Sequence, residues 1–415
     1  MKTAERTNPR SVEPGGSTDT PWSRLTTSLS LVDIGSLPVL LGLVLIAIIF
    51  QIANPNFLTP LNLTNLMIQL SATGTIAVGI VLVLLIGEID LSVGAVSGFC
   101  ASVMAVLSVK MGAPALVAVG AGVIAGAAIG LLQGYWFAKL HVPSFVVTLA
   151  GFLGWQGALL YTLGETGTIN LNDQLIVGIA NYRLPVWLGW ALGILFVGVY
   201  AVGIILNRQQ RAKVGMRTEP LSLMIGRVAL LAVGLLVAIG LMNANRSFTA
   251  VPIQGVPSAV LLFIGFIVIF DFITKRTQFG RYIFAVGGNA EAARRAGINV
   301  EQIRIQVFML GSTLAACGGI LAGSRLLAVN QSSGSGDVLL NAIAAAVIGG
   351  TSLFGGRGST WSALLGALVI QSISNGMDLL ALSSSIKFMV TGAVLLLAVT
   401  LDAYARSRRE ASGRS

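Results

Sequence analysis

The sequence predicts an all-α protein that crosses a membrane many times, as a bundle of about twelve transmembrane helices. Of its 415 residues, 55% are hydrophobic and only 10% are charged, and the mean hydropathy is +0.85. Apolar runs close to the length that spans a bilayer recur between residues 37 and 402. A water-soluble core does not need such runs, so these observations favour a polytopic membrane protein.

The polar ends of the chain flank the expected membrane domain, residues 37–402. Residues 1–36 are rich in Thr, Ser, Pro and Gly and lack the pattern of a signal peptide, so we expect a disordered cytoplasmic tail. Residues 403–415 form a basic tail. The expected spans are residues 37–53, 63–86, 91–108, 115–138, 144–163, 185–206, 223–242, 256–273, 303–324, 337–354, 361–380 and 386–402.

The distribution of Lys and Arg predicts how the helices are oriented. These residues gather in the loop 207–222, in the loop 274–304 and in the C-terminal tail. By the positive-inside rule all three segments face the cytoplasm. An even number of spans then places the N-terminus on the same side.

Composition argues against several classes of function. The net charge of +10 comes from loops between apolar runs, so membrane topology explains it and we expect no nucleic-acid partner. Two cysteines and one histidine provide neither a disulfide framework nor a metal site, so we expect no metal and no cofactor. The spans contain no pairing of a nucleophile with a base, so we do not expect an enzyme. The phosphate-binding pattern G-x-x-x-x-G-K-[ST] is absent from the chain.

The most unusual segment is the polar stretch 279–300, which lies between apolar runs. Asn289 is expected to cap a helix of about two turns, in which Glu291 precedes Arg294 and Arg295 by one turn and which Gly297 ends. An isolated helix this short is marginal in water, so we expect it to be ordered by packing against something else.

Two glycine-rich motifs with the same spacing predict a partial internal repeat. Gly87-x-x-x-Leu91-x-x-Gly94 matches Gly349-x-x-x-Leu353-x-x-Gly356. In the second motif, Gly350 directly follows Gly349. Each follows a span that runs from outside to inside, so both are expected at the cytoplasmic rim. Chance similarity in a glycine-rich chain is the alternative.

The first motif carries two carboxylates, Glu88 and Asp90. At the rim, Asp90 with the help of Ser92 is expected to cap a helix that begins at Leu91. A proton or cation site is the alternative, because acidic residues inside a bilayer are usually functional.

Uncharged polar residues within the spans allow two interpretations. They either fix the packing through interhelical hydrogen bonds or line a path for a neutral polyhydroxylated solute. The scarcity of charges in the middle of spans argues against an ion-driven carrier. The candidates are Gln69, Gln133, Gln156, Asn341, Gln371 and Asn375.

Four segments, 86–95, 142–151, 279–300 and 342–359, resemble the permease subunits of bacterial ABC importers for monosaccharides. The resemblance implies a homodimer in the inner membrane, an ABC-type ATPase on the cytoplasmic side and a periplasmic sugar-binding protein. It also implies that the cytoplasmic loop 274–302 couples to the ATPase. The residues it assigns to this contact are Gly280, Arg281, Asn289, Glu291, Ala292, Ala293, Arg294, Arg295, Ala296 and Gly297.

The resemblance extends to the substrate. An additional hairpin, residues 185–255, matches the layout of the xylose-type permeases, so D-xylose or another pentose is the expected substrate. The chain departs from the family pattern at Leu339, Leu340 and Asn341, where two carboxylates are missing. A stand-alone secondary carrier or facilitator is the alternative function. Arg357, in the second glycine-rich motif, is expected to face lipid headgroups or a partner.

Overall fold

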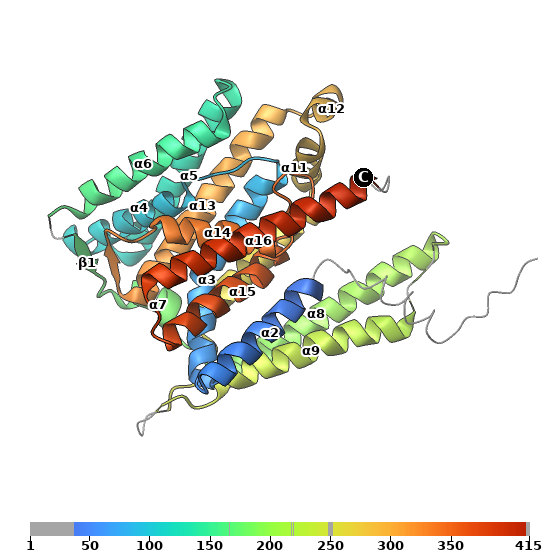
Figure 1. Cartoon of the computed structure of the whole chain (residues 1–415), viewed down its shortest axis with the longest axis horizontal. Coiled ribbons are helices and arrows are strands. Elements are labelled where there is room, and N and C mark those ends of the chain that lie inside the picture. Colours follow the sequence, from blue (N-terminus) through green and yellow to red (C-terminus); the bar gives the residue numbers. More distant parts are fainter. Residues whose placement is uncertain (1–36, 166, 217, 219, 248–251, 412–415) are drawn as a thin grey trace, which may run out of the picture. The chain divides into compact units, whose positions relative to one another are not determined.

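A helix occupies each of the ranges that the apolar runs predict (Figure 1). The computed structural model describes residues 37–411 except 166, 217, 219 and 248–251. The predicted N-terminal tail, residues 1–36, and the last residues of the C-terminal tail, 412–415, lie outside the described part. The helices at the predicted ranges are α2 (Leu37–Ala53), α3 (Pro60–Leu85), α4 (Val93–Ala105) with the π-helical η1 (Val106–Lys110), α5 (Ala115–Lys139), α6 (Ser144–Leu163), α8 (Val186–Lys213), α9 (Leu221–Asn243), α10 (Ser258–Arg276), α13 (Val300–Leu326), α14 (Gly336–Ile348), α15 (Trp361–Leu379) and α16 (Ser384–Ala411).

The predicted class, an all-α polytopic membrane protein, is confirmed, whereas the count of twelve spans is not. Within the described residues, eight helices are long and apolar enough to cross a membrane: α3, α4 with η1, α5, α6, α8, α9, α10 and α13. Shorter apolar helices cover Val39–Ala53, Asp337–Ile348 and Ser384–Leu397.

Some predicted boundaries differ from the structure. α8 continues to Lys213, beyond the predicted end at residue 206, because its polar residues favour helix and Arg211 and Lys213 suit a helix C-terminus. α14 ends at Ile348 rather than near residue 354, because Gly349 and Gly350 form a turn in which Gly350 has φ +103°. The predicted loop 274–304 is mostly helical and contains α11 (Gln278–Gly288) and α12 (Ala290–Arg295).

α13 packs along its length against α3, α4 and α5. Glycines permit the close approach: a Cβ at Gly130 of α5 would lie 2.4 Å from the carbonyl oxygen of Phe308, and one at Gly79 of α3 would lie 2.7 Å from that of Gly311. Small residues allow helix backbones to approach in a membrane, where van der Waals contact replaces the hydrophobic effect. These contacts make the centre of the bundle.

The predicted additional hairpin is formed by α8 and α9. In the most apolar stretches of these two helices, only 6% and 11% of the residues are buried. α8 reaches the bundle where the rings of Phe196 and Trp361 meet with centroids 6.4 Å apart, and α9 packs against α3. The exposed apolar faces suit contact with lipid.

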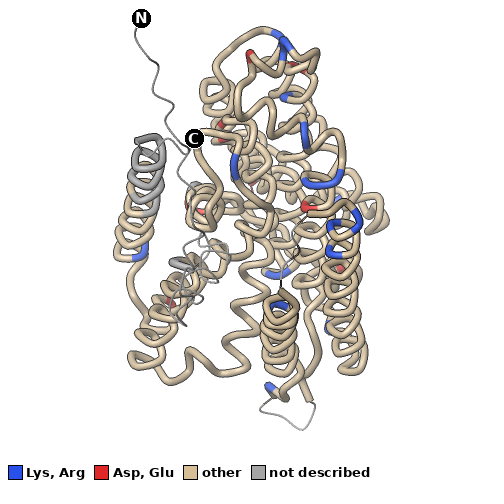
Figure 2. Tube along the Cα trace, turned by 90° about the vertical axis from the view of Figure 1, so that its right-hand side faces the viewer, with Lys and Arg blue, Asp and Glu red and all other residues tan. Residues whose placement is uncertain are grey.

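The two ends of the bundle differ in structure and charge. At the α12 end, basic residues close the last turns of α5, α8 and α10, and Figure 2 shows Lys and Arg spread over the side that faces the viewer. At the opposite end, β1 (Thr168–Asn170) pairs antiparallel with β2 (Ala328–Asn330). There α7 (Gln174–Asn181) is held by Ser324, whose hydroxyl accepts from the Ala180 amide at 2.9 Å. The segment between the predicted spans 144–163 and 185–206 therefore contains a strand and a helix, β1 and α7, at this end.

Candidate functional site

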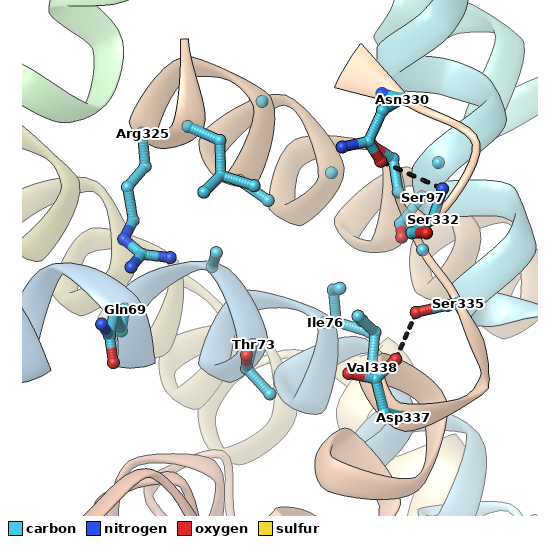
Figure 3. A pocket seen from close by; sticks show the side chains of 18 of the residues that line it. Gln69, Thr73, Ile76, Ser97, Arg325, Asn330, Ser332, Ser335, Asp337 and Val338 are labelled. Carbon is cyan, nitrogen blue, oxygen red and sulfur yellow. Dashed lines mark hydrogen bonds between the residues drawn. The ribbon is translucent and has the colours of Figure 1, made fainter. Parts of the chain in front are cut away.

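A cavity of about 400 Å³, lined by both polar and apolar residues, opens between α3, α4, α13, α14 and α15 (Figure 3). Its volume lies within the range of about 300–1,000 Å³ that small-molecule sites occupy. Most polar groups in its wall are hydroxyls and amides, the partners that a hydroxylated solute needs. The polar lining residues are Gln69, Thr73, Ser97, Arg325, Asn330, Ser332, Ser333, Ser335, Asp337, Gln371 and Asp378.

The segment after β2 forms one wall because glycines let it approach α4. A Cβ at Gly98 would lie 2.0 Å from the carbonyl oxygen of Ser333, and one at Gly94 would lie 2.9 Å from that of Gly334. Gly334 itself has φ +71°, a conformation that favours glycine. Asn330 fixes the turn, since its Oδ1 accepts from the Ser332 amide at 3.0 Å. The backbone thereby places three serine side chains in the cavity wall.

The cavity contains charges that the sequence analysis did not anticipate. Arg325 comes from the last turn of α13, Asp337 from the first turn of α14 and Asp378 from α15. Asp378 forms an ion pair with Lys387 of α16, and Asp337 accepts a hydrogen bond from the Ser335 hydroxyl. Asp378 lies inside the predicted span 361–380, so its position in an apolar run was the signal that could have revealed it. All three charges lie at helix ends, so the scarcity of charges in the middle of spans is unchanged.

Of the predicted pathway residues, the structure brings Gln69 and Gln371 together in the cavity wall. Their side chains bond to each other, with Gln371 Nε2 donating to Gln69 Oε1 at 2.8 Å. Asn375 instead pairs with Asn62 in two bonds of 2.7 and 3.0 Å. Gln156 donates to the carbonyl oxygen of Gln331 at 3.3 Å.

Gln133 and Asn341, like Asn375 and Gln156, do not line this cavity. Gln133 is buried beside Ser92, as described below, and Asn341 is half-buried on α14. The hydrogen bonds of Asn375 and Gln156 fit the packing interpretation of uncharged polar residues.

At the opposite end, the predicted short helix is present as α12. Asn289 Oδ1 accepts from the Ala292 amide at 2.9 Å, and Gly297 has φ +85° where the helix ends. Glu291 lies 3.2 Å from the guanidinium of Arg294 and 3.4 Å from that of Arg295. The local signals in the sequence therefore sufficed to predict this helix.

One residue assigned to the ATPase contact does not fit that role. Ala293 is only 4% exposed and packs into the core of its own chain, so it does not belong to an external packed face. Its neighbours Ala292 and Ala296 are exposed, as is Arg281 on α11. Gly280 is structural, because a Cβ there would lie 2.1 Å from the carbonyl oxygen of Thr274. The chain itself thus orders α12 through Ala293.

The two glycine motifs lie side by side, in contact with the end of α11. The Gly356 amide donates to the Leu85 carbonyl oxygen at 2.9 Å, and a Cβ at Gly287 would lie 1.8 Å from that same oxygen. The matched positions do not share a conformation, however, because Gly87 has φ +79° and Gly349 has φ −68°. These motifs are therefore not equivalent turns of a repeat.

Glu88 and Asp90, the carboxylates of the first glycine-rich motif, are more buried than we expected for residues at the cytoplasmic rim. α4 begins at Val93, not at Leu91, and Asp90 stabilises the turn before it by accepting from the Ser92 amide at 2.8 Å and the Ser92 hydroxyl at 2.6 Å. The Ser92 hydroxyl also lies 3.1 Å from Gln133 Oε1. Asp90 is 3% exposed, and this burial raises the pKa of its carboxyl.

Glu88 links this turn to two helices. It accepts from the Ser144 hydroxyl at 2.6 Å and lies 3.2 Å from the guanidinium of Arg304. Burial raises the pKa of the Glu88 carboxyl, and the two contacts oppose that rise. Asp90 thus has a structural role in the turn, while Glu88 joins neighbouring helices.

A family model described as "Branched-chain amino acid transport system / permease component" matches residues 62–399. The chain belongs to this permease family. The permease is 38% identical over 352 residues, covering 85% of this chain and 87% of the relative, to the xylose transport system permease protein of Escherichia coli (strain K12). It is 36% identical over 375 residues, covering 88% and 96%, to the protein of the same name from Haemophilus influenzae.

A ribose import permease protein of Escherichia coli (strain K12) is 34% identical to the permease over 362 residues, covering 87% of this chain and 91% of the relative. No solved structure matches the permease. Family and relatives confirm the predicted resemblance to sugar permeases and the prediction of a transport protein rather than an enzyme.

Proposed function

We propose that this chain is the membrane-spanning permease subunit of an ATP-driven monosaccharide importer, with D-xylose as the first candidate substrate. The observation that carries the proposal is the cavity, whose wall of hydroxyl and amide groups suits a polyhydroxylated solute. The xylose and ribose permeases among the relatives support this substrate class.

The α12 end faces the cytoplasm of a bacterium in this proposal, and the protein lies in the inner membrane with both termini inside. The basic residues at that end support the orientation. The cavity then opens near the outer side, where a periplasmic sugar-binding protein delivers its solute to a homodimer of the permease. The ordered α7 and β1 provide a surface for that delivery.

A separate ABC-type ATPase binds at α11 and α12. The exposed residues Arg281, Arg294 and Arg295 supply charged contacts, and Ala292 and Ala296 supply a small apolar face. Lipid covers the exposed helices α8 and α9. Closure of the ATPase dimer moves α12 and, through α13, the wall of the cavity.

A stand-alone secondary carrier is the second candidate. The charges in the cavity favour it, because ion-coupled carriers use ionisable groups close to the solute. Under this alternative, α12 has no ATPase partner.

Uptake of labelled xylose and ribose into proteoliposomes distinguishes the two functions. The permease is reconstituted alone, then with an ABC ATPase and a sugar-binding protein, with and without internal ATP. An importer requires both partners and ATP. Uptake by the permease alone, independent of ATP, contradicts the proposal and supports the carrier.

A further inference from the structure

Arg325 and Asp337 lie across the cavity from each other (Figure 3). Arg325 extends over the α3 wall near Gln69, and Asp337 lies beside Ser335 on the other side. Within the described part of the chain, the Arg325 side chain donates no hydrogen bond to protein, and its electrostatic neighbour is Asp378. A half-buried guanidinium with its donors unused faces the space that a solute would occupy.

The charges around the cavity balance. Asp378 pairs with Lys387 from outside the lining and is also the electrostatic neighbour of Arg325, so these two pairs of opposite charges, Arg325 with Asp337 and Lys387 with Asp378, sum to zero. A solute that spans the cavity contacts both groups: a carboxylate can pair with the Arg325 guanidinium but is then repelled by Asp337, and a cation can pair with Asp337 but is repelled by Arg325. A neutral solute does not meet this penalty.

A polyol matches both groups at once. A hydroxyl accepts a hydrogen bond from the planar guanidinium and donates one to a carboxylate, and neighbouring hydroxyls fit the fixed fork of an arginine. The described lining contains no aromatic side chain on which a sugar ring could stack. Recognition in this cavity therefore depends on polar contacts.

We propose that Arg325 and Asp337 are the specificity-determining pair of the cavity and that they select a neutral polyhydroxylated solute over the corresponding carboxylate. This inference rests on the proposed function for the choice of a sugar as the solute. The inference names the residues that contact the solute and states that the solute is uncharged.

Protection of a cysteine in the cavity tests the pair without any transport partner. In a background with Cys100→Ala and Cys317→Ala, Ser332→Cys places a thiol in the wall with a minimal change of size. The full-length permease, purified in detergent, is labelled with a charged methanethiosulfonate at increasing concentrations of D-xylose or D-xylonate. Ser384→Cys, at the exposed start of α16 and outside the lining, is the matched control.

Xylose is expected to slow the labelling of Ser332→Cys and not that of Ser384→Cys, whereas xylonate is expected to protect neither. Adding Arg325→Gln or Asp337→Asn should raise the xylose concentration needed for half-protection roughly tenfold or more, because each removes hydrogen bonds to a charged group. Arg183→Gln, which changes an exposed arginine outside the cavity, should leave that concentration unchanged.

Stronger protection by xylonate than by xylose would overturn the inference, and so would equal protection in the Arg325→Gln and Arg183→Gln variants. A variant that misfolds is recognised because the purified protein no longer shows a cooperative melting transition. Arg325→Lys then replaces Arg325→Gln, because lysine keeps the charge and loses the planar fork. ATP-dependent uptake with partners but without xylose protection would reject this inference and leave the proposed function intact. Protection by xylose without ATP-dependent uptake would support this inference and reject the proposed function.

Discussion

Glu88, in the turn after α3, and Arg304, near the start of α13, form an ion pair with 3.2 Å between carboxylate and guanidinium. The Arg304 guanidinium also lies 4.8 Å from the ring centroid of Phe137 on α5, and Glu88 accepts from Ser144 at the start of α6. One pair of side chains thus joins α3, α5, α6 and α13 at the α12 end. Since α12 leads into α13 within a few residues, this junction lies where a movement of α12 enters the bundle.

Arg304→Gln is expected to destabilise the permease by about 2 kcal/mol, between the values typical of exposed and of buried pairs. The side chains of Arg304 and Glu88 are 23% and 16% exposed, so solvent screens the pair only in part. The measurement is thermal unfolding of the purified protein, with Glu88→Gln and the double variant completing a double-mutant cycle. Additive effects of the two single changes would show that the pair contributes nothing.

Asp90 predicts a pH dependence of stability. Burial raises the pKa of this carboxyl above its value of 3.8 in the unfolded chain, so the native protein holds the proton more tightly. The stabilising contribution is complete below the unfolded pKa and is lost as pH rises through the folded pKa. The stability of the parent protein should therefore decline from about pH 4 upward, by at most about 1.4 kcal/mol per pH unit for one proton. Asp90→Asn stays neutral at every pH, so this variant should show a flatter decline.

The raised pKa of Glu88 acts in the same direction, so Asp90→Asn removes part of the slope and the double change with Glu88→Gln removes more. Melting temperatures measured across this pH range test the prediction. Asp173→Asn is the control, because it makes the same chemical change at the cap of α7, where asparagine also caps. A decline that is equally steep with and without Asp90→Asn would count against this assignment.

The sequence predicted α12 because its signals are local. The cap at Asn289, the pairs of Glu291 and the terminating Gly297 all fall within one short segment, and each was found in the structure. α11 was missed, although Phe279, Ile283 and Val286 recur at helical spacing, because its polar residues favoured a loop interpretation. Periodicity was the better guide there.

The cavity could not be predicted in the same way. Its wall combines Gln69, Ser97, Arg325, Asp337 and Asp378 from five separate helices with the segment after β2. The pairing of β1 with β2 brings segments about residues 168 and 330 together, and such non-local contacts leave no periodic trace in one sequence. Arg325 was assigned to a loop because it follows the predicted end of an apolar run by one residue.

Charge reversal on α12 tests the proposed ATPase contact. Arg294→Glu with Arg295→Glu should weaken association with the ATPase at least about tenfold, since truncating one partner of an interfacial charge pair costs roughly 2–5 kcal/mol. Both side chains are largely exposed, so the membrane fold should be retained. Co-purification of permease and ATPase at several salt concentrations provides the measurement.

The charge reversal also breaks the ion pairs of Arg294 and Arg295 with Glu291, which weakens α12 itself. Arg294→Gln with Arg295→Gln breaks the same ion pairs without reversing the charge. Comparing the two double variants therefore distinguishes the loss of the ATPase contact from the weakening of the helix. Arg208→Glu with Arg211→Glu on α8 is the control for a change of charge at the same end of the bundle. ATPase binding that survives the α12 reversal but not the α8 reversal would place the contact elsewhere.

Gly287 and Gly288 give a sharp test of how α11 is joined to the bundle. A Cβ at Gly287 would lie 1.8 Å from the Leu85 carbonyl oxygen and 2.7 Å from the Gly356 amide nitrogen, whereas one at Gly288 would have no atom within 4 Å. Both neighbours of Gly287 are backbone atoms, and they are bonded to each other, so they cannot move aside separately. Gly287→Ala should therefore separate α11 from α3, at a cost of about 1–3 kcal/mol.

Gly288→Ala replaces a neighbouring glycine at the same helix end, and its methyl group meets open space. We expect Gly287→Ala to lower both the melting temperature and the sugar transported per ATP hydrolysed, with Gly288→Ala close to the parent protein in both. A loss of melting temperature without a change in that ratio would make the junction purely structural. Equal behaviour of the two variants would mean that α11 does not rest on the Leu85 backbone during transport.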